Sequence, residues 1–172
     1  MHTNTLRAAL LAYKFPPESK GWALIFGRVL CGYLAEHRDW FEKFDYIIPS
    51  PTFTGPGSRR TWDHIRLILE RAAVEADEPW PFFLSQPPLI MKTRDTTSMT
   101  GKTLRERRTI AETELRPALS VPRPELVQGK RVLVFDDVFT DGSTLQEIAL
   151  RLRAAGAVDV AQVVLARAPW RQ

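Results

Sequence analysis

Four short runs of apolar residues, without the alternation of a half-exposed strand, mark the chain. They cover residues 46–48, 88–92, 132–135 and 158–166. Such runs are typical of strands that helices cover on both faces, as in parallel sheets. We therefore expect these four segments to form one parallel sheet.

Between the runs, apolar residues recur at intervals of three and four positions, which predicts amphipathic helices. This pattern covers residues 18–36, 62–74 and 145–152, and it is weaker across 102–115. Strands that alternate with helices indicate an α/β fold, in which helices flank a parallel sheet. In such folds ligands bind beyond the carboxyl ends of the strands.

Polar residues follow the third run directly. Two adjacent carboxylates, Asp136 and Asp137, precede a loop made of Thr140, Asp141, Gly142, Ser143 and Thr144, and a predicted helix comes next. The loop amides and the helix dipole favour a phosphate, and Gly142 lets the backbone approach it. If the chain leaves strand geometry there, both carboxylates can accept hydrogen bonds from one sugar. The pattern predicts a site for a ribose 5-phosphate, although loop capping and an N-cap are the structural alternatives.

A second polar segment, residues 51–60, follows the first apolar run. It contains Thr52, two glycines, and the pair Arg59 and Arg60. Backbone donors and guanidinium groups both match phosphate oxygens, so a pyrophosphate is the expected ligand. A solvated loop before a basic helix start is the structural alternative. The segment leaves the same end of the sheet as the carboxylate pair, which favours the ligand site.

Residues 132–145, VLVFDDVFTDGSTL, resemble the phosphoribosyl pyrophosphate (PRPP) motif of type I phosphoribosyltransferases. The rest of the chain is similar to the ComF branch of that family, which is associated with competence. The similar segments are 12–15, 45–51, 59–64 and 94–107. The resemblance implies one domain over residues 1–172. Its expected fold is a type I phosphoribosyltransferase-like parallel sheet flanked by helices, with a small N-terminal or hood region.

The same resemblance implies an enzyme, a glycosyltransferase that moves a phosphoribosyl group from PRPP to a nitrogen acceptor and releases pyrophosphate. Asp136 and Asp137 would hold the ribose hydroxyls, and the loop from Thr140 to Thr144 would hold the 5-phosphate. The pyrophosphate would lie against Thr52, Arg59, Arg60 and Lys102. Mg²⁺ would arrive bound to PRPP oxygens and water, without protein side chains as ligands. The acceptor is not identified by any motif.

Residues 92–108 form the most basic window, with six Lys or Arg against two acidic residues. A P-loop is excluded because position 96 is Thr rather than Gly. Relatives in the family close a mobile loop over PRPP, a role that would fall to Lys102, Arg105 and Arg107. Solvated charge on an exposed helix explains these residues equally well.

Several residues depart from the family pattern. Thr140 stands where purine-salvage relatives carry an Asp, which disfavours a hypoxanthine-type mechanism. Asp141 brings a negative charge into the phosphate loop. His64 stands where the branch has Gln, and we expect it to be a helix-surface or satisfied polar residue.

Composition is consistent with one compact domain in a reducing, cytoplasmic setting. The 172-residue chain has a single cysteine, Cys31, so neither an internal disulfide nor a multi-cysteine zinc site can form. The early apolar stretch 22–35 is too short to span a bilayer, and we expect no membrane contact. Trp80, Phe82 and Phe83 are expected to pack internally or to form the contact of a homodimer.

A non-enzymatic alternative stays open. The pI near 9.5 and the net charge of +4 permit binding of single-stranded DNA, with PRPP as a regulatory ligand or absent. Basic faces are commonly only solvated, so charge alone does not decide between the two functions.

Overall fold

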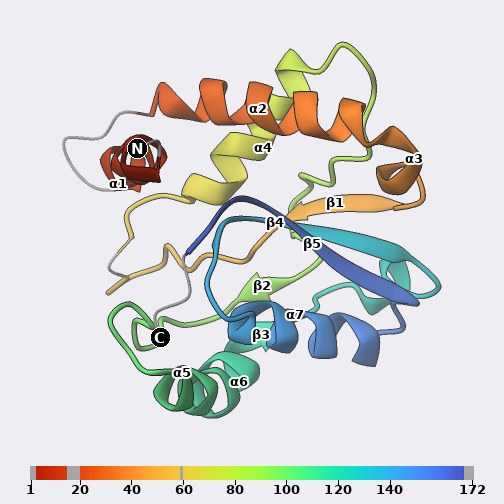
Figure 1. Cartoon of the computed structure of the whole chain (residues 1–172). Coiled ribbons are helices and arrows are strands. Elements are labelled where there is room, and N and C mark those ends of the chain that lie inside the picture. Colours follow the sequence, from red (N-terminus) through yellow and green to blue (C-terminus); the bar gives the residue numbers. More distant parts are fainter. Residues whose placement is uncertain (1–2, 15–19, 59, 169–172) are drawn as a thin grey trace.

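Three parallel strands form the centre of the computed structural model, which describes residues 3–14, 20–58 and 60–168. The strand order is β1 (Tyr46–Pro49), β4 (Arg131–Phe139), β5 (Asp159–Arg167). Helices cover both faces of this sheet (Figure 1). The predicted α/β fold, a parallel sheet flanked by helices, is therefore confirmed.

Two groups of helices flank the sheet. One face carries α1 (Thr3–Lys14), α2 (Trp22–Glu36), α3 (Arg38–Phe41) and α4 (His64–Glu75). The other carries α5 (Leu104–Ile110), the π-helical turn η1 (Ala111–Leu115), α6 (Arg116–Ala118) and α7 (Ser143–Ala154). A separate antiparallel pair joins β2 (Met91–Lys92) to β3 (Leu119–Ser120), and the 3-10 turn η2 (Pro124–Leu126) precedes β4. In the described ranges, no helix is both long and apolar enough to cross a membrane.

Strand β4 is the middle of the core because both faces of its apolar run are covered. Leu133 and Phe135 belong to the core beneath α1, α2 and α4, whereas Val132 and Val134 belong to the core beneath α7. All four side chains are fully buried. Burial of such a side chain stabilises the fold by about 1.5–3 kcal/mol. The run lacks polar residues at alternate positions because helices cover both of its faces.

One strand prediction is wrong. Residues 88–92 do not join the parallel sheet, because only Met91–Lys92 is a strand and it pairs antiparallel with β3. The place beside β1 is taken by Phe82, which bridges Ile47 in parallel. Ile47 donates to the carbonyl of Pro81 at 2.8 Å and accepts from Phe83 at 2.9 Å. The aromatic segment therefore packs internally, with Trp80 and Phe82 against the core under α2 and α4.

Helix boundaries follow their caps. Helix α4 begins at His64 rather than at residue 62, because Asp63 Oδ1 accepts a hydrogen bond from Arg66 N at 3.0 Å. Helix α5 begins after Thr103, which forms a capping box with Glu106. Helix α2 begins at Trp22, and the predicted helical residues 18 and 19 lie outside the described part of the chain.

The crossing of α2 and α4 generates a prediction for two glycines of α2. A Cβ at Gly27 would lie 2.8 Å from the backbone nitrogen of Ala72, whereas a Cβ at Gly32 would meet no atom within 4 Å. We expect Gly27→Ala to lower the free energy of unfolding by about 1–3 kcal/mol, because backbone must move. The matched variant Gly32→Ala should raise it by about 0.5–1 kcal/mol, because alanine favours the helix. Urea denaturation measures both changes, and equal effects would contradict the close crossing.

Candidate functional site

The carboxyl ends of β1 and β4 form one rim of the sheet. The strands pair in parallel up to Pro49 and Phe135, and Ser50 N then donates to Phe135 O at 2.8 Å. This bond holds the start of segment 51–60 beside the carboxylate pair that follows Phe135. The two segments that the sequence predicts to bind one ligand thus share one rim.

Asp137 is the most heavily contacted carboxylate at this rim. Its side chain forms an ion pair with Lys14, the last residue of α1, and its Oδ2 lies 3.4 Å from Nε2 of His64, the first residue of α4. The Tyr13 hydroxyl donates to the backbone oxygen of His64 at 2.6 Å. Three elements from distant parts of the chain therefore meet at one buried carboxylate.

Burial and its partners shift the titration of this cluster. Burial raises the pKa of Asp137, but the contact with His64 and the charge of Lys14 outweigh it and hold that pKa at about 2. Burial lowers the pKa of His64, against the opposing pull of Asp137, so its imidazole is neutral at pH 7. Only 5% of His64 is exposed, and its Nδ1 has no hydrogen-bond partner among the described residues. Of the two alternatives expected for His64, the helix-surface position is wrong, and the satisfied polar residue holds for Nε2 but not for Nδ1.

Asp136 lies in a different electrostatic environment from its neighbour. It is half-buried, and its Oδ1 accepts a hydrogen bond from the backbone nitrogen of Asp137 at 2.9 Å. Burial first, and the charge of Asp137 second, raise the pKa of Asp136 to about 7. At neutral pH Asp137 is thus ionised, while Asp136 is close to the midpoint of its titration.

The predicted phosphate loop has the expected glycine turn, but the backbone amide of Ser143 already donates a hydrogen bond within the loop. Gly142 has a φ of +83°, a conformation that glycine adopts at low cost, and α7 begins at the buried Ser143. Asp141 Oδ1 accepts from Ser143 N at 3.0 Å, and its Oδ2 lies 3.6 Å from Arg107. The carboxylate of Asp141 therefore holds the amide and the guanidinium that an incoming phosphate would need.

The basic window lies against this loop. Arg107 reaches Asp141, and Met99 Sδ accepts the hydroxyl of Thr144 at 3.7 Å. Lys102, which precedes α5, instead pairs with Glu106 of that helix, with 3.6 Å between the charged groups. The structure therefore brings Arg107 to the loop, whereas Lys102 is engaged elsewhere.

The remaining predicted residues divide between the rim and its surroundings. Thr52 and Arg60 are half-buried in the segment after β1, and the positive charge of Arg60 contributes to the lowered pKa of His64. Thr140 is exposed at the end of β4. Arg59 lies outside the described residues.

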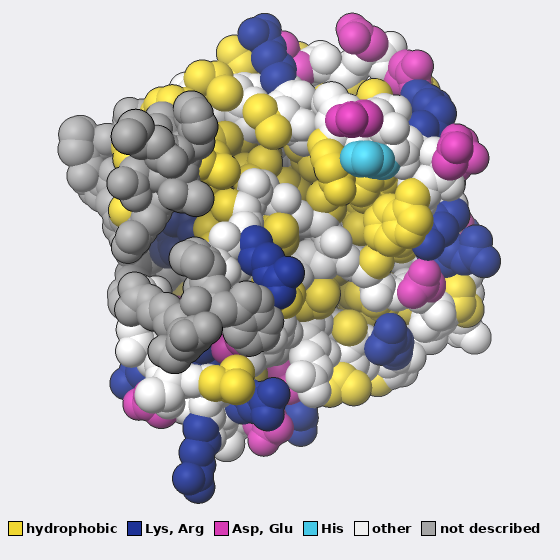
Figure 2. Space-filling model, viewed as in Figure 1, with side chains coloured by type: hydrophobic (Ala, Val, Ile, Leu, Met, Phe, Trp, Pro, Cys, Tyr) yellow, Lys and Arg dark blue, Asp and Glu magenta, His cyan; other side chains and the backbone are white. Residues whose placement is uncertain are grey.

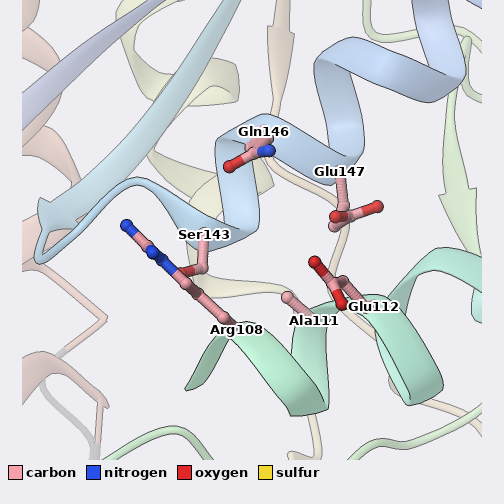
Figure 3. Close-up of a pocket in the computed structure, with 6 residues that line it drawn as sticks. All are labelled: Arg108, Ala111, Glu112, Ser143, Gln146 and Glu147. Carbon is pink, nitrogen blue, oxygen red and sulfur yellow. The ribbon is translucent and has the colours of Figure 1, made fainter. Parts of the chain in front are cut away.

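A cavity of about 290 Å³ adjoins the loop on its α5 side. Its lining residues are Arg108, Ala111, Glu112, Ser143, Gln146 and Glu147 (Figure 3). Glu147 is buried and accepts two hydrogen bonds from Arg116, at 2.6 and 3.0 Å, rather than pairing along α7. The cavity continues the phosphate loop toward the basic helix.

Sequence reasoning missed Lys14 and His64 as parts of the site. Lys14 belongs to a segment with a noted family resemblance, and His64 follows the predicted pyrophosphate segment, so both had a weak signal. Neither signal identifies Asp137 as the partner, because that contact depends on how α1 and α4 pack.

No family model and no curated protein matches the chain. One similar solved structure is described as the allosteric regulatory enzyme of purine biosynthesis, with a TM-score of 0.47 and 21% identity over 83% of this chain. The chain spans 25% of that protein's length. Another is a hypoxanthine phosphoribosyltransferase from Staphylococcus aureus, with a TM-score of 0.45 and 11% identity, covering 90% of this chain and 77% of that one. The likeness to both structures is slight.

The opposite pKa shifts of the two carboxylates predict opposite effects of pH on stability. Protonated Asp136 stabilises the fold fully below about pH 4, and this contribution is lost as the pH rises through 7. Asp136→Asn should therefore gain stability relative to the parent protein between pH 4 and pH 8, on the order of 2 kcal/mol after solvent screening.

Asp137→Asn provides the contrast. Ionised Asp137 stabilises the fold above about pH 4, and the contribution is lost as the pH falls toward 2. Its removal leaves the half-buried Lys14 without its partner and should cost about 3 kcal/mol at pH 7, the lower end of the range for a buried pair. Denaturation curves between pH 3 and pH 8 measure both variants, and parallel pH profiles would contradict the assignment.

Proposed function

We propose that this protein is a PRPP-dependent phosphoribosyltransferase of the ComF type, which transfers the phosphoribosyl group to a nitrogen acceptor with release of pyrophosphate. The observation that carries the proposal is the order of groups at one rim. The carboxylate pair lies in the last part of β4, and a glycine turn with positive φ and a helix N-terminus follow that strand, while segment 51–60 follows β1. This order suits a sugar, its 5-phosphate and its pyrophosphate.

The carboxylate pair would bind the ribose hydroxyls. Both oxygens of an ionised carboxylate accept hydrogen bonds, and ionised Asp137 provides the stronger acceptor. Because Lys14 and His64 already contact Asp137, a sugar hydroxyl must share that carboxylate with them. A hydroxyl that donates a hydrogen bond to Asp136 would lower the pKa of its carboxyl and so favour the ionised form.

The 5-phosphate would bind by exchange with Asp141. Its oxygens would take over the Ser143 amide and the guanidinium of Arg107, and the Asp141 side chain would turn away. Helix α7 has 12 residues, so its dipole also favours the phosphate. The phosphate would replace the contacts that Asp141 makes with the amide and the guanidinium rather than add to them. The affinity for the phosphate is therefore lower than it would be if these groups were free.

In the proposed chemistry the bond between C1 and the pyrophosphate oxygen breaks, and its electron pair leaves with pyrophosphate. The acceptor nitrogen then forms the new bond to C1, and its proton passes to water. The negative charge of Asp137 would stabilise the positive charge that develops on the ribose ring, and the positive charge of Arg60 would stabilise the leaving pyrophosphate. This is catalysis by position and electrostatics rather than by a protein nucleophile.

Mg²⁺ would be carried by the pyrophosphate oxygens, where it neutralises charge on the leaving group. The rim offers oxygen donors that suit this hard cation, the carboxylate of Asp136 and the hydroxyls of Ser50 and Thr52. These groups fit water-bridged contact with the ion.

The basic window does not favour DNA as the ligand. Three of its cations are paired within the protein, Lys92 with Asp95, Lys102 with Glu106 and Arg107 with Asp141. Cations that are already paired contribute less to the release of counterions from a nucleic acid. The phosphate-binding proposal explains the Arg107 contact, whereas DNA binding does not.

Titration calorimetry with Mg-PRPP tests the proposal. Asp136→Asn should weaken binding about tenfold or more, because a charged hydrogen bond is worth about 1.5–3 kcal/mol. The variant is expected to stay folded, so the loss reports on the ligand. Asp77→Asn, which removes an exposed carboxylate beyond the end of α4, is the matched control and should bind like the parent. Indistinguishable binding by all three proteins would overturn the site.

Asp141→Asn should bind Mg-PRPP more tightly than the parent, by roughly tenfold. The variant removes a negative charge that competes with the phosphate, and it keeps a side-chain oxygen for the loop. The same calorimetry measures the gain, and it should shrink at high salt because Arg107 and Asp141 interact electrostatically. Weaker binding would show that Asp141 supports the ligand rather than competing with it.

A further inference from the structure

Strand β5 leaves one edge of the parallel sheet open. It is the last strand in the order β1, β4, β5 and, among the described strands, it pairs with β4 alone. Its nine residues, DVAQVVLAR, include no Pro, Gly or Lys, the residues that commonly protect an edge. An edge of this length and composition is a template for pairing with another strand.

An apolar groove lies beside this edge. It has a volume of about 670 Å³ and lies between α2, α3 and residues 162–165 of β5. Val29, Tyr33 and Trp40 line it and are 56%, 46% and 45% exposed. None of the described residues that line the groove is Lys, Arg, Asp or Glu. Figure 2 shows hydrophobic side chains gathered over this face of the molecule.

The charges on β5 are complementary to those of a second β5. The strand begins with Asp159 and ends with Arg167. An antiparallel pair centred on Val163 places Asp159 of each copy opposite Arg167 of the other. A parallel pair would oppose like charges, and a shift by one residue would turn the apolar side chains to the wrong face.

The faces of the strand agree with this register. Val163 belongs to the core beneath α2, and the partly buried Ala161 and Leu165 pack against that core. In the antiparallel pair, Ala161 lies opposite Leu165, so these side chains stay on one face of the extended sheet. The exposed apolar residues of α2 in the two copies then lie on the same face of the extended sheet, on opposite sides of the two-fold axis.

We propose that a second copy of this chain occupies the edge, with β5 paired antiparallel to β5 about a two-fold axis at Val163. The two parallel sheets then form one continuous sheet, and the apolar groove of each copy is covered by α2 of the other. A two-fold interface uses the same surface on both copies, which a self-complementary strand satisfies. This dimer does not depend on the proposed transferase activity.

Sedimentation equilibrium of the full chain tests the surface. The parent protein should be a dimer at about 50 µM, a concentration at which interfaces of ordinary size are occupied. Val29→Lys should weaken the dimer at least about tenfold, because it buries an unpaired charge. Val74→Lys is the matched control, since Val74 is 75% exposed on α4 outside the groove. A monomeric parent protein, or equal effects of both variants, would overturn the proposal.

Charge exchange tests the register. Asp159→Arg alone places Arg opposite Arg, and Arg167→Asp alone places Asp opposite Asp, so each variant should dimerise about tenfold or more weakly. Mixed in equal amounts, the two variants should form a heterodimer with parent-like affinity, because both opposing pairs are again of opposite sign. Circular dichroism confirms that each variant is folded before mixing. Dimers of undiminished strength in either single variant, or no recovery on mixing, would overturn the antiparallel register.

Discussion

The buried contact of Lys14 and His64 with Asp137 is the interaction on which the arrangement of the rim depends. A carboxylate that is only 4% exposed is costly to bury unless it is paired. Its partners come from the end of α1 and the start of α4, and the Tyr13 hydroxyl links these two elements again. The charge at the end of β4 therefore fixes where two helices meet the sheet.

The same contact connects stability to the proposed chemistry. Desolvation raises the pKa of both carboxylates, but the cation and the imidazole that reach Asp137 reverse the shift there alone. At neutral pH the site therefore holds the ionised carboxylate of Asp137 beside the partly protonated carboxyl of Asp136. In the proposed function a ribose hydroxyl would use Asp137 as its acceptor, while partial protonation of Asp136 avoids the repulsion of two full charges at adjacent positions.

The sequence predicts well what is local and poorly what depends on distant partners. The unit from β4 to β5 is correct in its order, its helix and its glycine turn, because the apolar run and the helical spacing are properties of short windows. Strand β4 is longer than the apolar run predicts, since it continues through Asp136 and Asp137 to Phe139. Residues 88–92 show the limit. Their composition suits a buried strand, and Leu89 and Ile90 are indeed buried, yet the position beside β1 is occupied by Phe82. Two segments compete for the position beside β1, and the outcome depends on contacts between distant parts of the chain. A short stretch of sequence does not contain that information.

The site shows the same division. The carboxylate pair and the loop after it follow one another in sequence, so their proximity to segment 51–60 follows from parallel strands. Lys14 and His64 reach Asp137 only because α1 and α4 pack on one face of the sheet. For Asp141, the sequence shows a negative charge in the loop but does not show which cation it contacts. Its contact with Arg107 depends on the position of α5, which local pattern does not determine.

The geometry of the sheet separates the rim from the proposed dimer edge. The proposed ligand would bind beyond the carboxyl ends of β1 and β4, whereas the second copy would pair along the side of β5. In an antiparallel pair of β5 strands the carboxyl ends of the two sheets face opposite directions, so the two rims lie at opposite ends of the dimer. Neither copy would cover the other's rim, and dimer formation would stabilise the fold without closing the entrance to the site. Loss of the dimer should then affect stability before it affects binding at Asp136 and Asp137.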